Sequence, residues 1–329
     1  MRRELGVDSL VSVVVPIYNE AENLEPFVLE VYHVLKGLSL PGRIEFILCN
    51  DGSRDGSAEI LDRLAATYPG EVKAVHLARN FGHAAALSAS IAHARGDVVI
   101  AMDGDMQDDP AAFARFIANW KDGYDVVYAI RTSREENAAL RFLFWSFYRL
   151  LNWMANFDFP LDAGNFGLMD RSVVDNLRAM NERNLYLPGL RAWVGFRQVG
   201  VPVPRRRRYD RKTRVRLRGL WSLAMNAVFA FSNVPLFIFS VAGVAALGVS
   251  LGLFAVVSIA KLFTGGAFTP TMSLFISICF FAGVNLLGLA ILGGYIARIY
   301  DEVKGRPKYI VSRMTEFPQD NVSGQESHD

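Results

Sequence analysis

The sequence predicts an α/β head with a doubly wound, mostly parallel sheet, followed by a hydrophobic membrane anchor. Two observations support this prediction. Up to about residue 215, short apolar runs typical of buried strands alternate with segments of helical period. Beyond that point, Gly219–Ala260 and Leu262–Ala297 contain no charged residue, and only Lys261 separates them. The two parts together indicate a water-soluble domain that is held at a membrane.

The head is expected to alternate strands and helices. The strands are predicted at 11–16, 44–49, 72–77, 97–102 and 125–130. Helices are predicted at 21–36, through Ile60, Leu61 and Leu64, and from about His83 and Pro110. This alternation favours parallel strands with helices on both faces, and such sheets bind ligands beyond the carboxyl ends of their strands.

The anchor is predicted to be a hairpin, because a spanning helix needs about 20 apolar residues and the charge-free runs are longer. The spans are expected at 236–260 and 272–297, after an interfacial helix at 220–231. Lysine and arginine cluster at 205–218 and again at 298–308. Positive residues on both outer flanks predict a multi-pass protein of the inner (plasma) membrane whose head and tail are cytoplasmic.

Four segments follow from this reading. They are a head at 1–212, a basic and amphipathic juxtamembrane segment at 213–234, a two-helix transmembrane hairpin at 235–299 and a cytoplasmic tail at 300–329 that is partly disordered. We expect the membrane, and not nucleic acid, as a partner, because the net charge is only +2. Cys49 and Cys279 suggest no disulfide framework and fit a reducing compartment.

Several enzyme classes are disfavoured by missing motifs. No Gly-x-Gly-x-x-Gly follows the first strand, which disfavours a dinucleotide dehydrogenase. No Gly-x-x-x-x-Gly-Lys-Ser/Thr is present, which disfavours a P-loop NTPase. His33, His76, His83 and His93 lack the spacing of metal ligands, so we expect them to be ordinary helix or strand residues.

Three polar clusters follow predicted strands and therefore point to one site. They are Tyr18-Asn19-Glu20, Asn50-Asp51 and Asp103-Gly104-Asp105-Met106-Gln107. The carboxylates of Asp103 and Asp105 with the amide oxygen of Gln107 form an all-oxygen set suited to Mg²⁺ or Mn²⁺. An isolated Asp-x-Asp is more often a solvated turn, but its alignment with the other two clusters favours a metal site that neutralises a diphosphate.

At this point the chain resembles a known family. The segments Val13–Glu20, Asp51–Gly56, Arg79–Gly82, Gly96–Gln107, Phe147–Leu151, Gly167–Arg171, Trp193–Gln198 and Phe231–Leu236 resemble, in order, the family 2 (GT-A) glycosyltransferases. More narrowly they resemble polyprenyl-phosphate hexosyltransferases, such as dolichol-phosphate mannose synthases and bacterial bactoprenol glucosyltransferases. The resemblance implies a Rossmann-like GT-A sheet, a nucleotide-sugar donor, a polyprenyl phosphate acceptor and a homotetramer.

The resemblance also implies roles for individual residues. Asp105 and Gln107 would hold the divalent metal, and Arg131, with Arg141 as a weaker candidate, would meet the acceptor phosphate through a guanidinium fork. Asp162 would orient a sugar hydroxyl or the acceptor, and with Asp103, Asp105 and Arg131 it makes up the expected catalytic group. The nucleotide pocket would be lined by Pro16, Tyr18, Glu20, Asp51 and Asp103.

Some positions depart from the family pattern. Asn50 stands where the family usually has an aspartate, and Asn165 and Gly167 replace a second acidic residue and an arginine. Thr213-Arg214-Val215-Arg216 replaces a basic Thr-Lys-Tyr-like segment. These changes concern the sugar and acceptor parts of the site, so the reaction class is better indicated than the sugar.

Three functions are weighed. The favoured one is inverting transfer of a hexose, with glucose from UDP-glucose expected first and mannose, N-acetylhexosamine or a modified pentose left open. A processive polysaccharide synthase is disfavoured, because the chain lacks the Gln-x-x-Arg-Trp motif and further spans. A catalytically silent, membrane-bound scaffold is suggested by Asn50 and Asn165, but the retained metal set of Asp103, Asp105 and Gln107 argues against it.

Overall fold

The computed structural model describes residues 3–131, 163–180, 182, 186–204, 239, 241, 243–246, 248, 252 and 270–316. Its contacts divide the chain into two compact units. Unit 1 comprises Met1–Tyr148, Phe157–Arg214 and Pro307–Asp329, and unit 2 comprises Arg149–Asn156 and Val215–Arg306. The predictions for Arg141, Asp162, the interfacial helix and the last residues of the tail lie outside the described residues.

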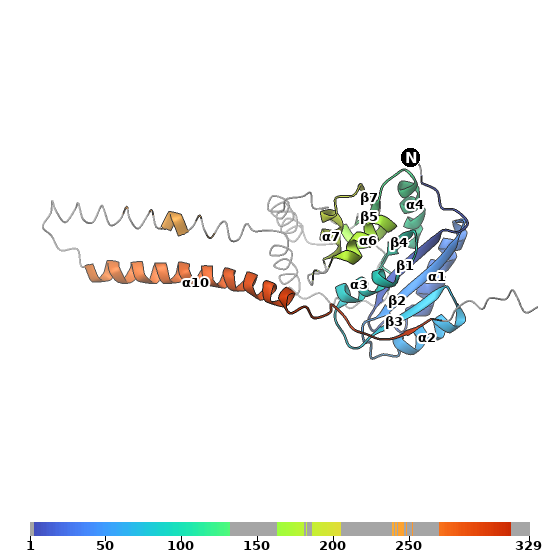
Figure 1. Cartoon of the computed structure of the whole chain (residues 1–329), viewed down its shortest axis with the longest axis horizontal. Helices are drawn as coiled ribbons and strands as arrows, with labels where there is room; N and C mark the ends of the chain where they lie inside the picture. Colours follow the sequence, from blue (N-terminus) through green and yellow to red (C-terminus); the bar gives the residue numbers. More distant parts are fainter. Residues whose placement is uncertain are drawn as a thin grey trace, which may run out of the picture. The chain divides into compact units, whose positions relative to one another are not determined.

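Unit 1 is built on one sheet, whose described strands have the order β7-β5-β6-β4-β1-β2-β3-β8 (Figure 1). The strands β1 to β4 pair in parallel, and so do β5 and β7. Strand β6 is antiparallel to both β4 and β5, and β8 is antiparallel to β3. The bounds are β1 Leu10–Ile17, β2 Arg43–Asn50, β3 Val72–Leu77, β4 Val98–Ala101, β5 Val126–Arg131, β6 Ala163–Asp170, β7 Gln198–Val203 and β8 Val311–Thr315.

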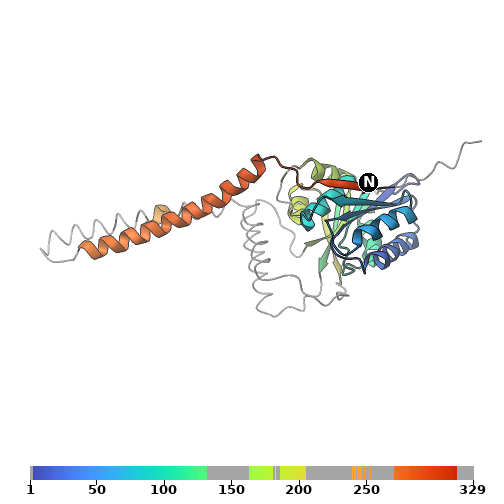
Figure 2. The ribbon, with the colours of Figure 1, turned by 90° about the horizontal axis from the view of Figure 1, so that it is seen from below.

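The prediction of a mostly parallel α/β sheet is confirmed, and each of the five predicted strands is present within one residue of its expected ends. The antiparallel strands β6 and β8 were not predicted. Strand β6 has the sequence AGNFGLMD, in which two glycines interrupt the apolar run. Strand β8 lies in the segment predicted as a tail, and Figure 2 shows it as the red arrow in unit 1. Both pair with strands far away in the sequence.

Helices cover both faces of the sheet and enclose two cores. Alternate strand residues point to opposite faces. Thus Val13 and Val15 pack with α1, α2 and α4, whereas Val14 packs with α3 and α6 on the other face. The bounds are α1 Leu24–Gly37, α2 Ser57–Thr67, α3 His83–His93, η1 Pro110–Ala112, α4 Phe113–Lys121, α6 Arg171–Ala179 and α7 Leu187–Trp193. The arrangement is the expected doubly wound one.

The register brings the ends of several strands to one edge of the sheet. Ile17 at the end of β1 lies opposite Asn50 at the end of β2, and Ala101 at the end of β4 lies opposite Val14. Strand β5 has the same direction as β4, because both are antiparallel to β6. We call this side, where β1 to β5 end and β6 begins, the carboxyl edge.

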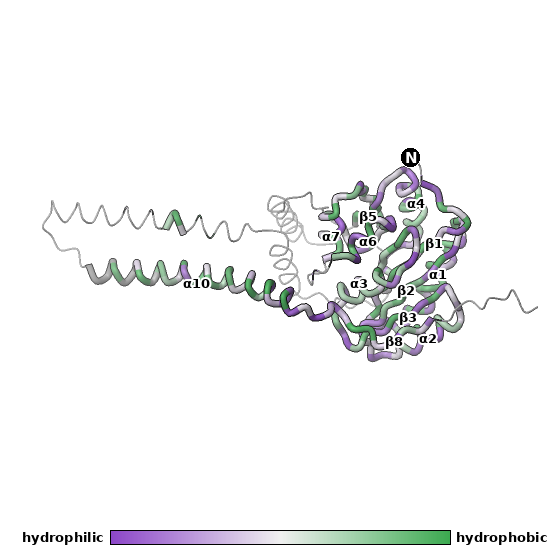
Figure 3. Tube along the Cα trace, viewed as in Figure 1, coloured by the Kyte–Doolittle hydropathy of each residue, from purple (hydrophilic) through white to green (hydrophobic). Residues whose placement is uncertain are grey.

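Unit 2 contains the long helix α10, Pro270–Val303. Its stretch Phe280–Val303 is long and apolar enough to cross a membrane, and Figure 3 shows hydrophobic residues along the helix. Leu286 and Leu289 are 67% and 64% exposed. The predicted first span lies mostly outside the described residues, but its Phe239 packs against Gly288 of α10, where any Cβ would overlap the Phe239 ring.

Candidate active site

The three predicted polar clusters lie at the carboxyl edge, after the neighbouring strands β4, β1 and β2. The loop after β1 and the turn after β2 are joined directly. The backbone N–H of Asn19 donates to Ser53 Oγ at 3.0 Å, and the N–H of Arg54 donates to Asn19 Oδ1 at 2.9 Å. Asn19 adopts a positive φ of 53°, which asparagine tolerates better than most residues. These two hydrogen bonds hold the loop after β1 against the turn after β2.

Asp51 holds the loop that leads into α3. Its Oδ1 accepts from the N–H of Phe81 at 2.7 Å, and its Oδ2 accepts from the N–H of Gly82 at 3.0 Å. Burial raises the pKa of Asp51, and the two N–H bonds oppose this rise. At Gly52, with φ +66°, a Cβ would lie 2.6 Å from the carbonyl carbon of Arg79, so only glycine allows the two loops to approach. The predicted nucleotide role of Asp51 stays a prediction.

The segment Asp103–Asp108 folds back on itself after β4. The N–H of Gln107 donates to Asp105 Oδ1, and the N–H of Asp103 donates to Asp108 Oδ2, each at 3.2 Å. Met106 has a positive φ of 58°. Oδ1 of Asp103 is buried, and no described residue gives it a hydrogen bond of good geometry. A buried carboxylate oxygen that lacks a well-formed hydrogen bond suits a ligand that carries hydrogen-bond donors or positive charge.

His83 is a residue of the site that the sequence analysis missed. It is the first residue of α3. Its Nε2 lies 3.4 Å from Asp103 Oδ1 and 2.9 Å from Asn165 Nδ2. His83 thus joins the aspartate cluster to the position where the family pattern has an acid. The available signal was its place directly after Arg79–Gly82, a segment that follows β3 and reaches the same edge.

The other predicted residues are placed less directly. Pro16 is buried within β1, Tyr18 is 39% exposed, and Glu20 is half-buried. Arg131 is the last residue of β5, paired with Val203 of β7, so its backbone lies at the carboxyl edge. The structure does not describe its side chain.

The donor set at this edge fits a divalent cation that is bound together with phosphate. No group of three or more His, Cys, Asp or Glu side chains could hold a metal among the residues that the structure describes. Mg²⁺, however, typically takes one or two carboxylates and completes its shell with substrate phosphates and water. The carboxylate of Asp105, the amide of Gln107 and the buried Oδ1 of Asp103 supply oxygen ligands of that kind.

Comparison with known proteins decides the family. Residues 12–178 match the family described as glycosyl transferase family 2. The chain belongs to glycosyl transferase family 2. It is therefore a glycosyltransferase, and its α/β sheet is of the GT-A-like kind that the sequence resemblance implied.

This family 2 member is similar to bactoprenol glucosyl transferases over nearly its whole length. It is 36% identical to the bactoprenol glucosyl transferase of Shigella phage SfII, covering 92% of this chain and 97% of that one. It is 35% identical to a prophage bactoprenol glucosyl transferase homolog of Escherichia coli (strain K12), covering 92% and 99%. An uncharacterized glycosyltransferase of Bacillus subtilis (strain 168), YkcC, is 39% identical, covering 92% and 93%.

A solved structure gives a more distant likeness. The mannosyltransferase PcManGT from Pyrobaculum calidifontis, in complex with GDP-Man and Mn²⁺, matches with a TM-score of 0.44 and 16% identity. The match covers 86% of this chain and 87% of that one. A likeness at this level carries no argument about the function of this family 2 member.

Proposed function

We propose that this enzyme transfers a hexose, glucose first, from a UDP-sugar to a membrane polyprenyl phosphate with inversion at the anomeric carbon. The observation that carries the proposal is the convergence of Asp51, His83, Asp103 and Asn165 at the carboxyl edge of a chain that also contains an apolar helix. The bactoprenol glucosyl transferases to which it is similar over 92% of its length support the lipid acceptor and the sugar.

Asp105 and Gln107 would hold Mg²⁺ or Mn²⁺, which when bound offsets the negative charge of the nucleotide diphosphate. The residues of this chain form and position the nucleotide site. Pro16, Tyr18 and Glu20, with Asp51 and Asp103, line the space for the nucleotide. Asp103 is oriented by the folded segment up to Asp108. The hydrogen bonds between the loop after β1 and the turn after β2 hold this part of the site in place before the donor binds.

The acceptor needs alignment more than it needs a base. A phosphate monoester has a second pKa of about 6, so its oxygen is already anionic at neutral pH. A neutral Asn165 in place of an acid is therefore compatible with transfer. We assign Arg131, with Arg141 as the weaker candidate, to the acceptor phosphate and Asp162 to orienting the sugar or the acceptor. Their common task is to place the phosphate oxygen in line with the anomeric carbon.

The membrane helix has a physical reason in this scheme. A polyprenyl chain stays in the bilayer, so a soluble active site must be held at the interface to reach its phosphate. We propose a multi-pass protein of the inner membrane with two spans, a cytoplasmic head and a homotetrameric assembly. The apolar stretch Phe280–Val303 supports membrane attachment.

The test is transfer of radiolabelled sugar from a panel of UDP- and GDP-sugars to added polyprenyl phosphate, with and without EDTA. We expect an acid-labile labelled lipid from one donor, lost on chelation. Asp105→Asn should lower kcat/KM by about 10²-fold or more, because removing a transition-state charge partner typically costs that much. Asp8→Asn, the same chemical change at an exposed residue ahead of β1, should leave it unchanged.

Two results would contradict the proposal. Absence of any lipid product, with folded protein and every donor tested, would favour the silent scaffold. Transfer that resists EDTA and Asp105→Asn would retain the glycosyltransferase but remove the metal from its chemistry.

A further inference from the structure

A row of polar side chains, buried at Asn50 and His76 and exposed at Arg313, connects the turn after β2 to the last strand of the sheet. Asn50 of β2, His76 of β3 and Arg313 of β8 are successive cross-strand neighbours. Asn50 Nδ2 lies 3.2 Å from His76 Nδ1, and His76 Nε2 lies 3.0 Å from Asp62 Oδ1 on α2. Asp62 in turn accepts hydrogen bonds from both terminal nitrogens of Arg313, at 2.8 and 2.6 Å. Neither His76 nor Asp62 takes part in the transfer proposed above.

The hydrogen-bond polarity of this row fixes the protonation of His76. The backbone N–H of Ser53 donates to Asn50 at 2.9 Å, so the atom of Asn50 that it meets is the amide oxygen. The other atom of that amide is the nitrogen, which can only donate, and it faces His76 Nδ1. Nδ1 must therefore be unprotonated, and the single ring proton is on Nε2, where it donates to Asp62. His76 is neutral in this arrangement.

The surroundings favour the same state. His76 is 3% exposed and Asn50 is 4% exposed. The charged groups that face the ring are Asp62 and Glu59 from α2 and Arg313 from β8. Burial and the charge of Arg313 lower the pKa of His76, and the two carboxylates oppose them. The net shift keeps the ring neutral at physiological pH.

The row also explains why asparagine stands at position 50. A carboxylate there could accept from Ser53 but could offer no proton to His76 Nδ1. It would require His76 to be doubly protonated between two acids, at residues 50 and 62. Asn50 and neutral His76 are thus a matched pair, and changing one alone leaves a buried polar group without its hydrogen bond, which is unfavourable.

We propose that neutral His76 is a positioning residue for donor binding: through Asn50 it holds the turn Asp51–Ser53 that forms the wall of the nucleotide pocket. The proposal rests on the proposed function, since it assumes that this edge binds a nucleotide. It adds that affinity depends on the protonation of a residue that does not touch the ligand. Below its pKa, His76 gains a proton at Nδ1, repels the Asn50 amide and releases the turn.

The test compares UDP binding by the full-length wild type and by Asn50→Asp, in detergent with Mg²⁺, by calorimetry from pH 5.5 to 8.5. The informative quantity is the dissociation constant of Asn50→Asp divided by that of the wild type. Titration of UDP itself affects both constants equally and cancels in this ratio. We expect a ratio near one at pH 5.5, where His76 can carry the proton that the introduced carboxylate needs. It should rise to about tenfold or more at pH 8.5, where that proton is lost.

Three further variants make the result specific to His76. In Asn50→Asp combined with His76→Gln, the row has no histidine to lose a proton, so the rise of the ratio towards pH 8.5 should be absent. His76→Gln alone should bind UDP within about twofold of wild type at pH 8, because its amide oxygen can accept from Asn50 and its nitrogen can donate to Asp62. His76→Leu, which can do neither, should weaken binding about tenfold.

A ratio for Asn50→Asp that does not change with pH, with tight binding by the wild type, would overturn this proposal and leave the proposed function intact. Equal loss of UDP affinity in His76→Gln and His76→Leu would also overturn it. This comparison decides the question if Asn50→Asp does not fold. Failure of the wild type to bind UDP would instead overturn the proposed function, and this proposal with it.

Discussion

Arg191 of α7 carries a fully buried guanidinium. Its Nη2 donates to the carbonyl oxygen of Gly164 at 3.1 Å, and its Cζ lies 5.2 Å from the centroid of the Tyr128 ring. Its Nε and Nη1 have no hydrogen-bond partner among the residues that the structure describes. Burial lowers the pKa of Arg191 to about 10, which shows how unfavourable the surroundings are for its charge. A buried charge without a carboxylate partner is expected to cost stability.

We therefore expect Arg191→Met to stabilise the protein, by about 1–2 kcal/mol, because Met keeps the packing of the stem and removes the desolvated charge. Thermal and urea unfolding of the wild type and the variant would measure this. Arg191→Lys is the matched control: it keeps a charge, loses the hydrogen bond from Nη2 to Gly164 and should be less stable than the wild type. A destabilised Arg191→Met would mean that the charge has a partner that these contacts do not include.

Some residues of the candidate site could be predicted from the sequence, and others could not. Asp51, Asp103 and Asp105 were predictable, because acids directly after apolar strands must reach the carboxyl edge of a parallel sheet. His83 was not, because a single histidine at a helix start has no spacing that marks it, and its partner Asn165 is 82 positions away in the sequence. The pairing of Asn50 with His76 needed the β2–β3 register, which no local pattern contains.

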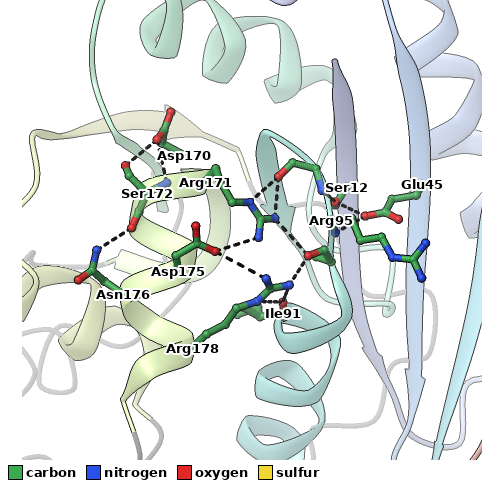
Figure 4. Close-up of polar contacts among 12 residues, drawn as sticks. Ser12, Glu45, Ile91, Arg95, Asp170, Arg171, Ser172, Asp175, Asn176 and Arg178 are labelled. Carbon is green, nitrogen blue, oxygen red and sulfur yellow. Dashed lines mark hydrogen bonds and ion pairs between the residues drawn. The ribbon is translucent and has the colours of Figure 1, made fainter. Parts of the chain in front are cut away.

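At the scale of elements, α6 holds the end of α3 in place (Figure 4). The last carbonyls of a helix lack partners within the helix. Arg178 of α6 donates to the carbonyl oxygens of Ile91 and Ala94, and Arg171 donates to that of Gly96 at 2.6 Å. Asp175 pairs with both guanidinium groups and so offsets the repulsion between them. This fixes the far end of the helix whose first residue is His83.

Arg178→Met should lower the free energy of unfolding by about 1–3 kcal/mol, because two partly buried carbonyls lose a charged donor. The measurement is the urea midpoint at constant slope. Arg43→Met is the control, since Arg43 is exposed and its change should stay within about 0.5 kcal/mol. Equal midpoints for the two variants would show that water replaces Arg178 at the helix end without cost.

Elements differ in how far the sequence predicts them, and the reason is the range of their contacts. The parallel strands were predictable because each is a short apolar run buried on both faces. Strand β6 was not, because its glycines serve close packing: a Cβ at Gly167 would lie 2.5 Å from the carbonyl oxygen of Val127 on β5. The aromatic ring of Phe166 in the same strand packs edge-on against Phe116 of α4, a tertiary contact with no local signal.

At the scale of the whole molecule, the chain leaves unit 1 after Arg214 and returns to it at Pro307. The returning segment adds β8 to the open edge of β3. It is held there by the fork from Arg313 to Asp62 and by an ion pair of 2.9 Å between Lys73 and Glu316. Burial opposes ionisation of Asp62, but the bonds from Arg313 and Thr315 lower its pKa to about 2. Unit 1 is therefore built from residues on both sides of unit 2 in the sequence.

This connectivity predicts how truncated proteins behave. A chain that ends at Arg214 lacks β8, exposes the hydrogen-bonding edge of β3 and leaves buried Lys73 without its acid. We expect it to melt at least about 10 °C below a chain in which a flexible Gly/Ser linker joins residue 214 directly to residue 307. Circular dichroism melting of both, without detergent, measures the difference.

The linked protein is the decisive comparison, because it lacks the apolar helix but keeps β8. Its stability should fall on acidification from about pH 4 towards pH 2, since Asp62 contributes stability above its unfolded pKa and loses it as pH falls through its folded value. Asp62 is partly exposed, so this acid-sensitive part is expected to be below about 1 kcal/mol. Equal melting temperatures for the truncated and linked chains would show that β8 is accessory. A large gap would mean that the enzyme completes its head only after the membrane segment has been made.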